Sequence, residues 1–129
     1  MNTEAPGRAD AGKAAFKLQL AGQSLRFRLD ESALARLLAG DTLSDCTLLD
    51  PGTRFTRSLC LDDSNEARLQ IDGSDWRLHL PGAAVRAYVA RLPCREGLAF
   101  TLAPAPGCTL DICFEVDVRD SRRVGRKRF

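Results

Sequence analysis

An internal repeat constrains this chain more than any other feature of its sequence. Residues 17–39 correspond without a gap to residues 68–90, which lie 51 positions further along. The identical pairs are Leu18/Leu69, Gln19/Gln70, Gly22/Gly73, Arg26/Arg77, Leu29/Leu80, Ala33/Ala84 and Ala39/Ala90. Six further positions are apolar in both copies. The main prediction is therefore a duplicated unit in which a β-hairpin leads into a helix.

The first copy carries the signals of each element in this unit. Apolar and polar residues alternate over 16–20 and again over 24–30, with Gly22 in the turn between them, which predicts a hairpin. Asp30 is a suitable N-cap for a following helix. Gly40 is a suitable C-cap. The expected buried stripe of this helix has helical spacing and consists of Leu34, Leu37 and Leu38.

The second copy repeats these signals with different residues. Alternation over 66–71 and 76–80 surrounds the turn dipeptide Asp72-Gly73, which is a strong hairpin signal. Pro81 suits the first position of a helix. The helix is expected to bury Val85, Tyr88, Val89 and Leu92.

Each copy continues into two more strands, at 43–49 and 53–61 in the first and at 98–102 and 109–119 in the second. The Pro51-Gly52 turn superposes on Pro106-Gly107 with four residues inserted. Arg57 falls on the apolar face of its strand, which indicates that the strand meets an edge or a rim there. The pseudo-repeats 16–62 and 66–118 each have the order ββαββ.

These patterns predict an α+β protein with one domain over residues 16–119. Eight antiparallel strands would form a closed barrel, or else a strongly curved open sheet, with two short helices on its apolar face. Closure would remove the exposed sheet edges and enclose a polar lumen. Neither half buries enough surface alone, so the two are expected to share one core.

The two ends of the chain differ from this domain in composition. Residues 1–15 are rich in Ala and Gly without any period, and we expect a disordered leader. Residues 119–129 hold six cations against Asp120, whereas the whole chain has a net charge of only +2. The expected basic tail, 120–129, therefore follows a mildly acidic body. Without interleaved aromatic residues or a basic body, specific nucleic-acid binding is not expected.

Cysteine usage and hydropathy narrow the class further. The five cysteines are odd in number, and none forms a Cys-x-x-Cys pair, so neither a disulfide framework nor a zinc site is indicated. No apolar run is long enough for a membrane span or a signal peptide. We expect reduced thiols, a cytoplasmic location, no membrane association and no cofactor.

Two resemblances accompany this interpretation. From Phe16 to about Arg119 the chain resembles an uncharacterised bacterial family of small proteins, a domain of unknown function. The resemblance rests on Ser24-Leu25-Arg26-x-Arg28-Leu29 with Lys17, Pro51-Gly52, Arg77-Leu78-x-Leu80-Pro81 and Glu115-x-Asp117. The duplicated architecture is also similar to the CYTH or triphosphate-tunnel barrels, which implies a barrel fold. That family places Glu-x-Glu-x-Lys before its first helix, where this chain has Arg26 and Arg28.

The polar strand faces supply the candidate site residues. The candidate ligand-binding residues are Lys17, Arg26, Arg28, Arg68, Arg77 and His79. Arginines on such a face can hold a phosphate or a carboxylate, or they can pair with carboxylates on neighbouring strands. Glu115 and Asp117 lie two apart on one strand face, a spacing that could hold Mg²⁺ with a ligand phosphate. No catalytic residue is assigned, because His79 has no nucleophile motif beside it.

The leading hypothesis is a non-catalytic module that binds a small anion or an acidic partner on its arginine-rich face. One alternative is a Mg²⁺-dependent phosphohydrolase of the triphosphate-tunnel type that uses Glu115 and Asp117. The other is a structural protein that binds a partner through its basic tail. The sequence alone does not identify a ligand or an oligomeric state.

Overall fold

The computed structural model describes residues 15–94 and 96–118, which form eight strands and two helices. The α+β class is therefore confirmed. In chain order the elements are β1 (Lys17–Ala21), β2 (Ser24–Asp30), α2 (Glu31–Leu38), β3 (Leu43–Asp50), β4 (Thr53–Asp62), β5 (Arg68–Asp72), β6 (Asp75–Pro81), α3 (Gly82–Val89), β7 (Leu98–Ala105) and β8 (Cys108–Asp117).

The strands form two four-stranded sheets, and each sheet combines a hairpin from one half of the chain with a hairpin from the other half. Sheet A has the order β1-β2-β8-β7, and sheet B has the order β3-β4-β6-β5. Each sheet thus takes one hairpin from each half. The repeat relates the first four strands in the chain to the last four, and this relation converts one sheet order into the other. The duplication is therefore expressed as a pseudo-twofold arrangement of the sheets.

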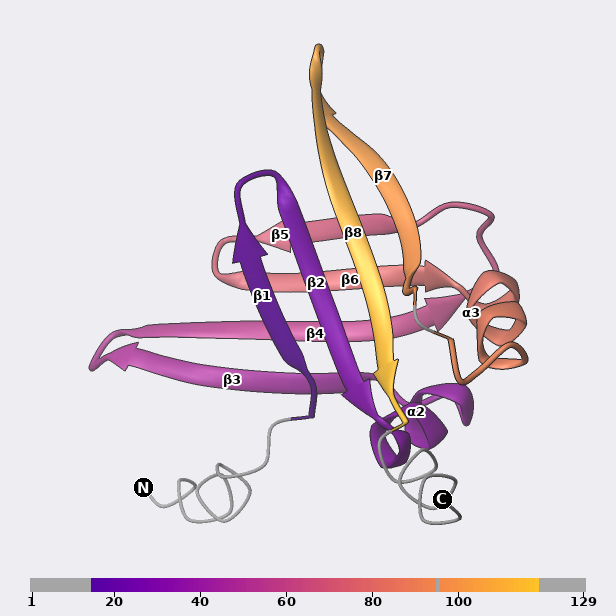
Figure 1. Ribbon diagram of the computed structural model, residues 1–129. Coiled ribbons are helices and arrows are strands. Elements are labelled where there is room, and N and C mark those ends of the chain that lie inside the picture. Colours follow the sequence, from indigo (N-terminus) through magenta and orange to yellow (C-terminus); the bar gives the residue numbers. More distant parts are fainter. Residues whose placement is uncertain (1–14, 95, 119–129) are drawn as a thin grey trace.

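The two sheets stack with their strands crossing steeply (Figure 1), as in orthogonal sandwiches. The expected eight-stranded antiparallel barrel is not formed by the described residues. Two pairs are also parallel: β2 with β8, and β4 with β6. Turns dictate antiparallel pairing only within a hairpin. The pairing between hairpins is decided by which apolar faces meet, and strand alternation alone does not reveal this.

The core lies between the sheets, because their apolar faces cover one another. The four inner strands supply most of it, and their buried residues are Leu25, Phe27, Leu29, Leu59, Leu78, Leu80, Ile112, Phe114 and Val116. We expected the helices to cover the apolar face of a single sheet, and this expectation was wrong. Instead each connects a strand of one sheet to a strand of the other, and both lie at the same corner of the sandwich (Figure 1).

The helix signals read from the sequence are largely confirmed. The Asp30 side chain caps α2 by accepting a hydrogen bond from the Ala33 amide at 2.8 Å. Gly40 follows the helix at φ 104°, a left-handed conformation that glycine adopts without steric cost. In α3 the corresponding cap position is Pro81, which makes no side-chain bond to the helix. Leu34, Leu37, Val85 and Tyr88 are buried as expected.

Sheet B extends beyond the area that sheet A covers. The tip of the β3–β4 hairpin projects past β1, which is the outer strand of sheet A on that side (Figure 1). Large apolar side chains near the strand ends are exposed there, with Leu48 at 61% and Leu49 at 63%. The inner face of sheet B therefore continues from the core into an open surface beside β1.

Several expectations concern residues outside those described. The leader, except for Ala15, and the tail 120–129 both lie outside them. No helix in the described part of the chain has the length and apolar character required to cross a bilayer.

Candidate functional site

The predicted cationic residues fall into two groups on opposite sides of the molecule. Lys17, Arg26 and Arg28 lie on the outer face of sheet A, and Arg68, Arg77 and His79 lie on the outer face of sheet B. They do not share one lumen, because the apolar faces of the two sheets meet and the polar faces therefore point apart. The pseudo-twofold relation makes the two groups equivalent.

On sheet A the arginines share one carboxylate. Nε of Arg26 lies 3.5 Å from Oε2 of Glu115, and Nη2 of Arg28 lies 3.4 Å from Oε1. The two arginine side chains are about half exposed, at 52% and 51%. Both oxygens of Glu115 are thus engaged by cations, which disfavours a role in metal binding. Among the described residues no group of three or more His, Cys, Asp or Glu side chains could hold a metal ion.

On sheet B the equivalent positions hold a thiol and an imidazole. Sγ of Cys60 lies 3.3 Å from Nδ1 of His79, and Nε2 of His79 lies 2.9 Å from Oε1 of Gln70. Because the Gln70 carbonyl oxygen can only accept, Nε2 carries the ring proton and Nδ1 accepts the proton of the thiol. Asp62 bonds Arg68 at 3.2 Å and lies 3.7 Å from Nδ1 of His79.

The electrostatics of this pair argue against nucleophilic catalysis. Burial raises the pKa of the Cys60 thiol. Burial, followed by the charge of Arg68, lowers the pKa of His79. Both groups are therefore neutral at pH 7, whereas a reactive cysteine is a thiolate in an electropositive site. The sequence analysis assigned no nucleophile to His79, and it overlooked Cys60 as its neighbour.

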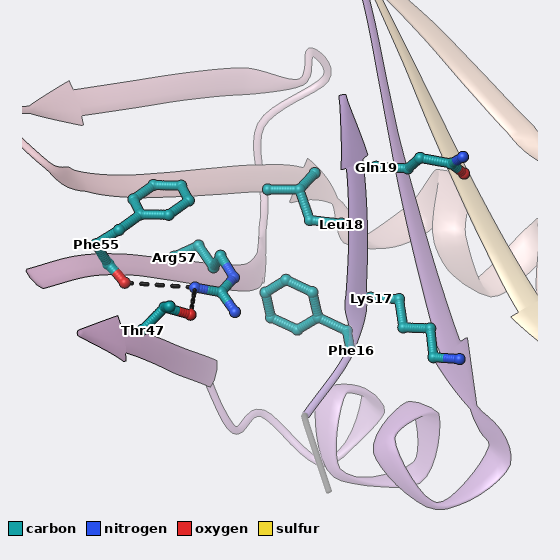
Figure 2. A pocket seen from close by; sticks show the side chains of 7 residues that line it. All are labelled: Phe16, Lys17, Leu18, Gln19, Thr47, Phe55 and Arg57. Carbon is teal, nitrogen blue, oxygen red and sulfur yellow. Dashed lines mark hydrogen bonds between the residues drawn. The ribbon is translucent and has the colours of Figure 1, made fainter. Parts of the chain in front are cut away.

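A pocket of about 550 Å³ lies where sheet A ends and sheet B continues. Its walls come from β1 on one side and from β3 and β4 on the other, and the lining residues are Phe16, Lys17, Leu18, Gln19, Thr47, Phe55 and Arg57. Phe16 and Leu18 point across the pocket toward β4, while Lys17 and Gln19 point away from it (Figure 2). The lining is therefore mostly apolar with Arg57 as its cation.

Arg57 is held in place by neutral groups. Its Nη1 donates to Oγ1 of Thr47 at 2.8 Å and to the carbonyl of Phe55 at 3.4 Å (Figure 2). The guanidinium carbon lies 5.2 Å from the centre of the Phe55 ring, within the range of a cation–π contact. Phe55 in turn packs edge-on against Trp76, with 5.0 Å between ring centres.

No ion pair neutralises this partly buried guanidinium among the described residues. Asp45 is the cross-strand partner of Arg57, but its Oδ2 accepts a hydrogen bond from the Ala15 amide at 3.0 Å. By contrast, Arg26, Arg28 and Arg68 each have a carboxylate partner. Nε and Nη2 of Arg57 are thus available to an incoming acceptor, in a surrounding that is less polar than the outer faces.

The repeat shows that polar residues here are a departure from the scaffold. When the two halves are aligned so that Phe55 corresponds to Leu110, three polar residues correspond to apolar ones. The equivalent pairs are Arg57 and Ile112, Thr47 and Leu102, and Asp45 and Phe100. Ile112 is buried at 1% exposure, and Phe100 and Leu102 pack against the core. One half therefore has three polar groups where the other half completes an apolar interface.

Sequence reasoning identified Arg57 as an exception but did not make it a site residue. The sequence did contain a signal for Arg57. Aligning the Pro-Gly turns of the two halves makes Arg57 the counterpart of the apolar Ile112. Phe16, Leu18 and Thr47 gave no such signal. Their meeting with Arg57 depends on the crossing of the two sheets.

Comparison with known proteins identifies no relative. No protein family model matches the chain, and neither a curated protein nor a solved structure matches it. The function is therefore inferred from the residues, contacts and charges of these sites.

Proposed function

We propose that the protein is a non-catalytic binding module that holds an anionic group of a ligand or partner against Arg57. The observation that carries this proposal is the guanidinium itself. It lies partly buried in a mostly apolar pocket, and it has no carboxylate partner among the described residues. A charge in such a setting gains most from an opposite charge that replaces its water.

The chemistry of the walls defines the class of ligand. Phe16, Leu18 and Phe55 favour an apolar body. The fork of Arg57 favours a carboxylate or a phosphate, because either can accept two parallel hydrogen bonds. The expected ligand is therefore an anion with an apolar portion rather than a fully hydrated ion.

The predicted arginine-rich faces are weaker candidates for the same role. Arg26 and Arg28 are half exposed and already share Glu115, while Arg68 is paired with Asp62. An anion that bound there would first have to displace these carboxylates. Its own ion pair with an arginine would then be exposed to water, and such exposed pairs contribute little binding free energy. The pocket places its free cation behind apolar walls instead.

The test is a titration of the protein with sodium 3-phenylpropionate and with the uncharged 3-phenylpropionamide, followed by two-dimensional NMR. We expect the acid to shift resonances of Phe16, Leu18 and Phe55, with a dissociation constant on the order of millimolar for so small a ligand. The amide should bind about tenfold or more weakly, because a hydrogen bond to a charged group contributes about 1.5–3 kcal/mol.

Two variants locate the effect. Arg57→Gln should remove the preference for the acid, whereas Arg54→Gln, an exposed arginine on the same strand, should keep it. Equal binding of acid and amide by the wild-type protein would contradict the proposal. Loss of binding in Arg26→Ala but not in Arg57→Gln would move the site to the outer face of sheet A.

A further inference from the structure

We propose that the occupant of the Arg57 pocket is an extended acidic peptide segment of a partner protein, which pairs with the free edge of β1 as a fifth strand of sheet A. This inference rests on the proposed function, because it takes the binding of an anion by Arg57 as given. It adds the form of the ligand and the backbone groups that recognise it.

The first observation is that β1 lines the pocket with its backbone. The first three residues of β1, 17–19, and Phe16 directly before them contribute to the lining. The side chains of Lys17 and Gln19 nevertheless point away from the pocket (Figure 2). Main-chain atoms of β1 therefore form part of the wall, and a ligand in the pocket meets peptide groups as well as side chains.

The second observation is that this edge of sheet A is open. β1 is the terminal strand in the order β1-β2-β8-β7, and it pairs with β2 alone among the described strands. The outward-facing N–H and C=O groups of such an edge are a template for another strand. Peptide recognition by strand addition uses this template for affinity, and it uses pockets for alternate side chains to gain specificity.

The third observation fixes the chemistry of the added strand. A strand beside β1 would lie about 4.8 Å away and would point alternate side chains toward the projecting inner face of sheet B. An acidic side chain at one of these positions would meet Arg57. Apolar side chains two residues before or after it would cover Phe55 and Leu20, of which Leu20 is 62% exposed.

The experiment begins with selection from a displayed library of random ten-residue peptides against the full chain. We expect enriched sequences to alternate, with Asp or Glu flanked at two-residue spacing by apolar residues. The same selection against the Arg57→Gln protein should lose this acidic position. No enrichment over that variant would overturn the inference.

The most enriched peptide is then synthesised in three forms: unmodified, N-methylated on its odd amides and N-methylated on its even amides. Only one set of amides can face β1 in an added strand. One methylated form should therefore bind about tenfold or more weakly, through its lost hydrogen bonds, and the other should bind like the unmodified peptide. Binding of the unmodified peptide should also slow amide hydrogen exchange within 17–21.

The outcomes separate this inference from the proposed function. If both methylated forms bind equally well while 3-phenylpropionate still requires Arg57, the pocket binds anions but no strand is added, and the inference fails alone. If neither the acid nor any peptide depends on Arg57, both fail. Concentration-dependent protection of 17–21 without peptide would indicate a second copy as the occupant and would also overturn it.

A matched variant sharpens the electrostatic part. Asp45→Asn removes the negative charge opposite Arg57 in the β3–β4 register. It should tighten binding of the acidic peptide severalfold, as expected for a partly exposed charge pair, while a peptide with Gln in place of its acid should be unaffected. If the acidic peptide bound this variant more weakly than the wild-type protein, the proposed orientation of the acid toward Arg57 would be contradicted.

Discussion

The two halves of the sandwich solve the same packing problem with different residues. Where β8 meets β2, Ile112 pairs with Leu25, and both are buried. Where β4 meets β6, the equivalent pair is Arg57 with Trp76, and both are partly exposed. The same scaffold therefore has an aliphatic residue at this position in sheet A and a cation at the equivalent position in sheet B. Arg57 thus departs from the apolar pattern of its equivalent position, as its proposed role in binding requires.

The largest effect should come from exchanging the residues at these two positions. Ile112→Arg places an unpaired charge in the core, and we expect a loss of about 3–5 kcal/mol in the free energy of unfolding. Arg57→Ile should stay within about 1 kcal/mol of the wild-type protein, because it only extends an apolar surface. Urea unfolding of both variants measures the difference.

If Ile112→Arg prevents folding, Ile112→Val provides a measurable control, with an expected loss of about 0.5–1.5 kcal/mol. Similar losses for Arg57→Ile and Ile112→Arg would show that the native residues at the two positions contribute equally to stability. In that case Arg57 would have a role in stability that the comparison denies it.

A smaller effect should separate the starts of the two helices. Asp30 accepts a hydrogen bond from the Ala33 amide, while its counterpart Pro81 makes no such bond. Asp30→Ala should therefore cost about 1 kcal/mol, and Pro81→Ala should cost clearly less through the helix cap. Thermal unfolding of the two variants provides the measurement, and a larger loss from Pro81→Ala would reverse the comparison.

A still smaller effect is expected on the outer face of sheet A. Glu115→Gln removes the carboxylate shared by Arg26 and Arg28, whose side chains are half exposed. The expected loss is about 0–1 kcal/mol, and it should shrink in high salt because exposed pairs are screened. Unfolding at low and high ionic strength tests this. A salt-independent loss above about 2 kcal/mol would mean that the pair is far less solvated than its exposure indicates.

The smallest effect should appear as a pH dependence on sheet B, where His79 takes the place of Arg28. The pKa of His79 is lower in the folded protein than in the unfolded chain, first because of burial and then because of Arg68. As the pH falls below about 6.5, the unfolded chain binds the proton first, so stability present above this pH is lost. His79→Gln should flatten the dependence between about pH 7 and pH 5.

The control for this prediction is the equivalent position on sheet A. Arg28→Gln removes the side chain at the equivalent position and leaves His79 in place, so the pH dependence should persist unchanged. Stability that rises on acidification in the wild-type protein, or an unchanged slope in His79→Gln, would contradict the direction assigned to the pKa of His79.

The local elements were predictable because local residues determine them. Alternation, the Asp72-Gly73 turn and the Asp30 cap act within a few positions, and the repeat confirmed that two halves shared one plan. The parallel pairing of β2 with β8 was not predictable in this way. No turn links these strands, and alternation is satisfied by either direction of pairing.

The candidate site could not be predicted for the same reason, because it depends on how the hairpins pair and how the two sheets cross. Arg57 stood out on its strand, and the expectation of a rim agrees with its place where sheet A ends, although β4 is an inner strand of its sheet. Cys60 became a neighbour of His79 only through the parallel register of β4 with β6. The polar residues were correctly assigned to polar faces, but the idea of one shared lumen required a closure that does not occur.

The hairpin exchange also makes two equivalent sheets unequal during synthesis. Sheet B is built from the uninterrupted segment 43–81, whereas sheet A joins 17–30 to 98–117. As the chain leaves the ribosome, sheet B can assemble while β8 is still untranslated, and its apolar face then lacks half of its cover. The last of the described strands, β8, carries Ile112 and Phe114, so the core is sealed only after sheet B has been translated. This interval, when the apolar face is open, is the point at which the nascent chain is most prone to aggregate.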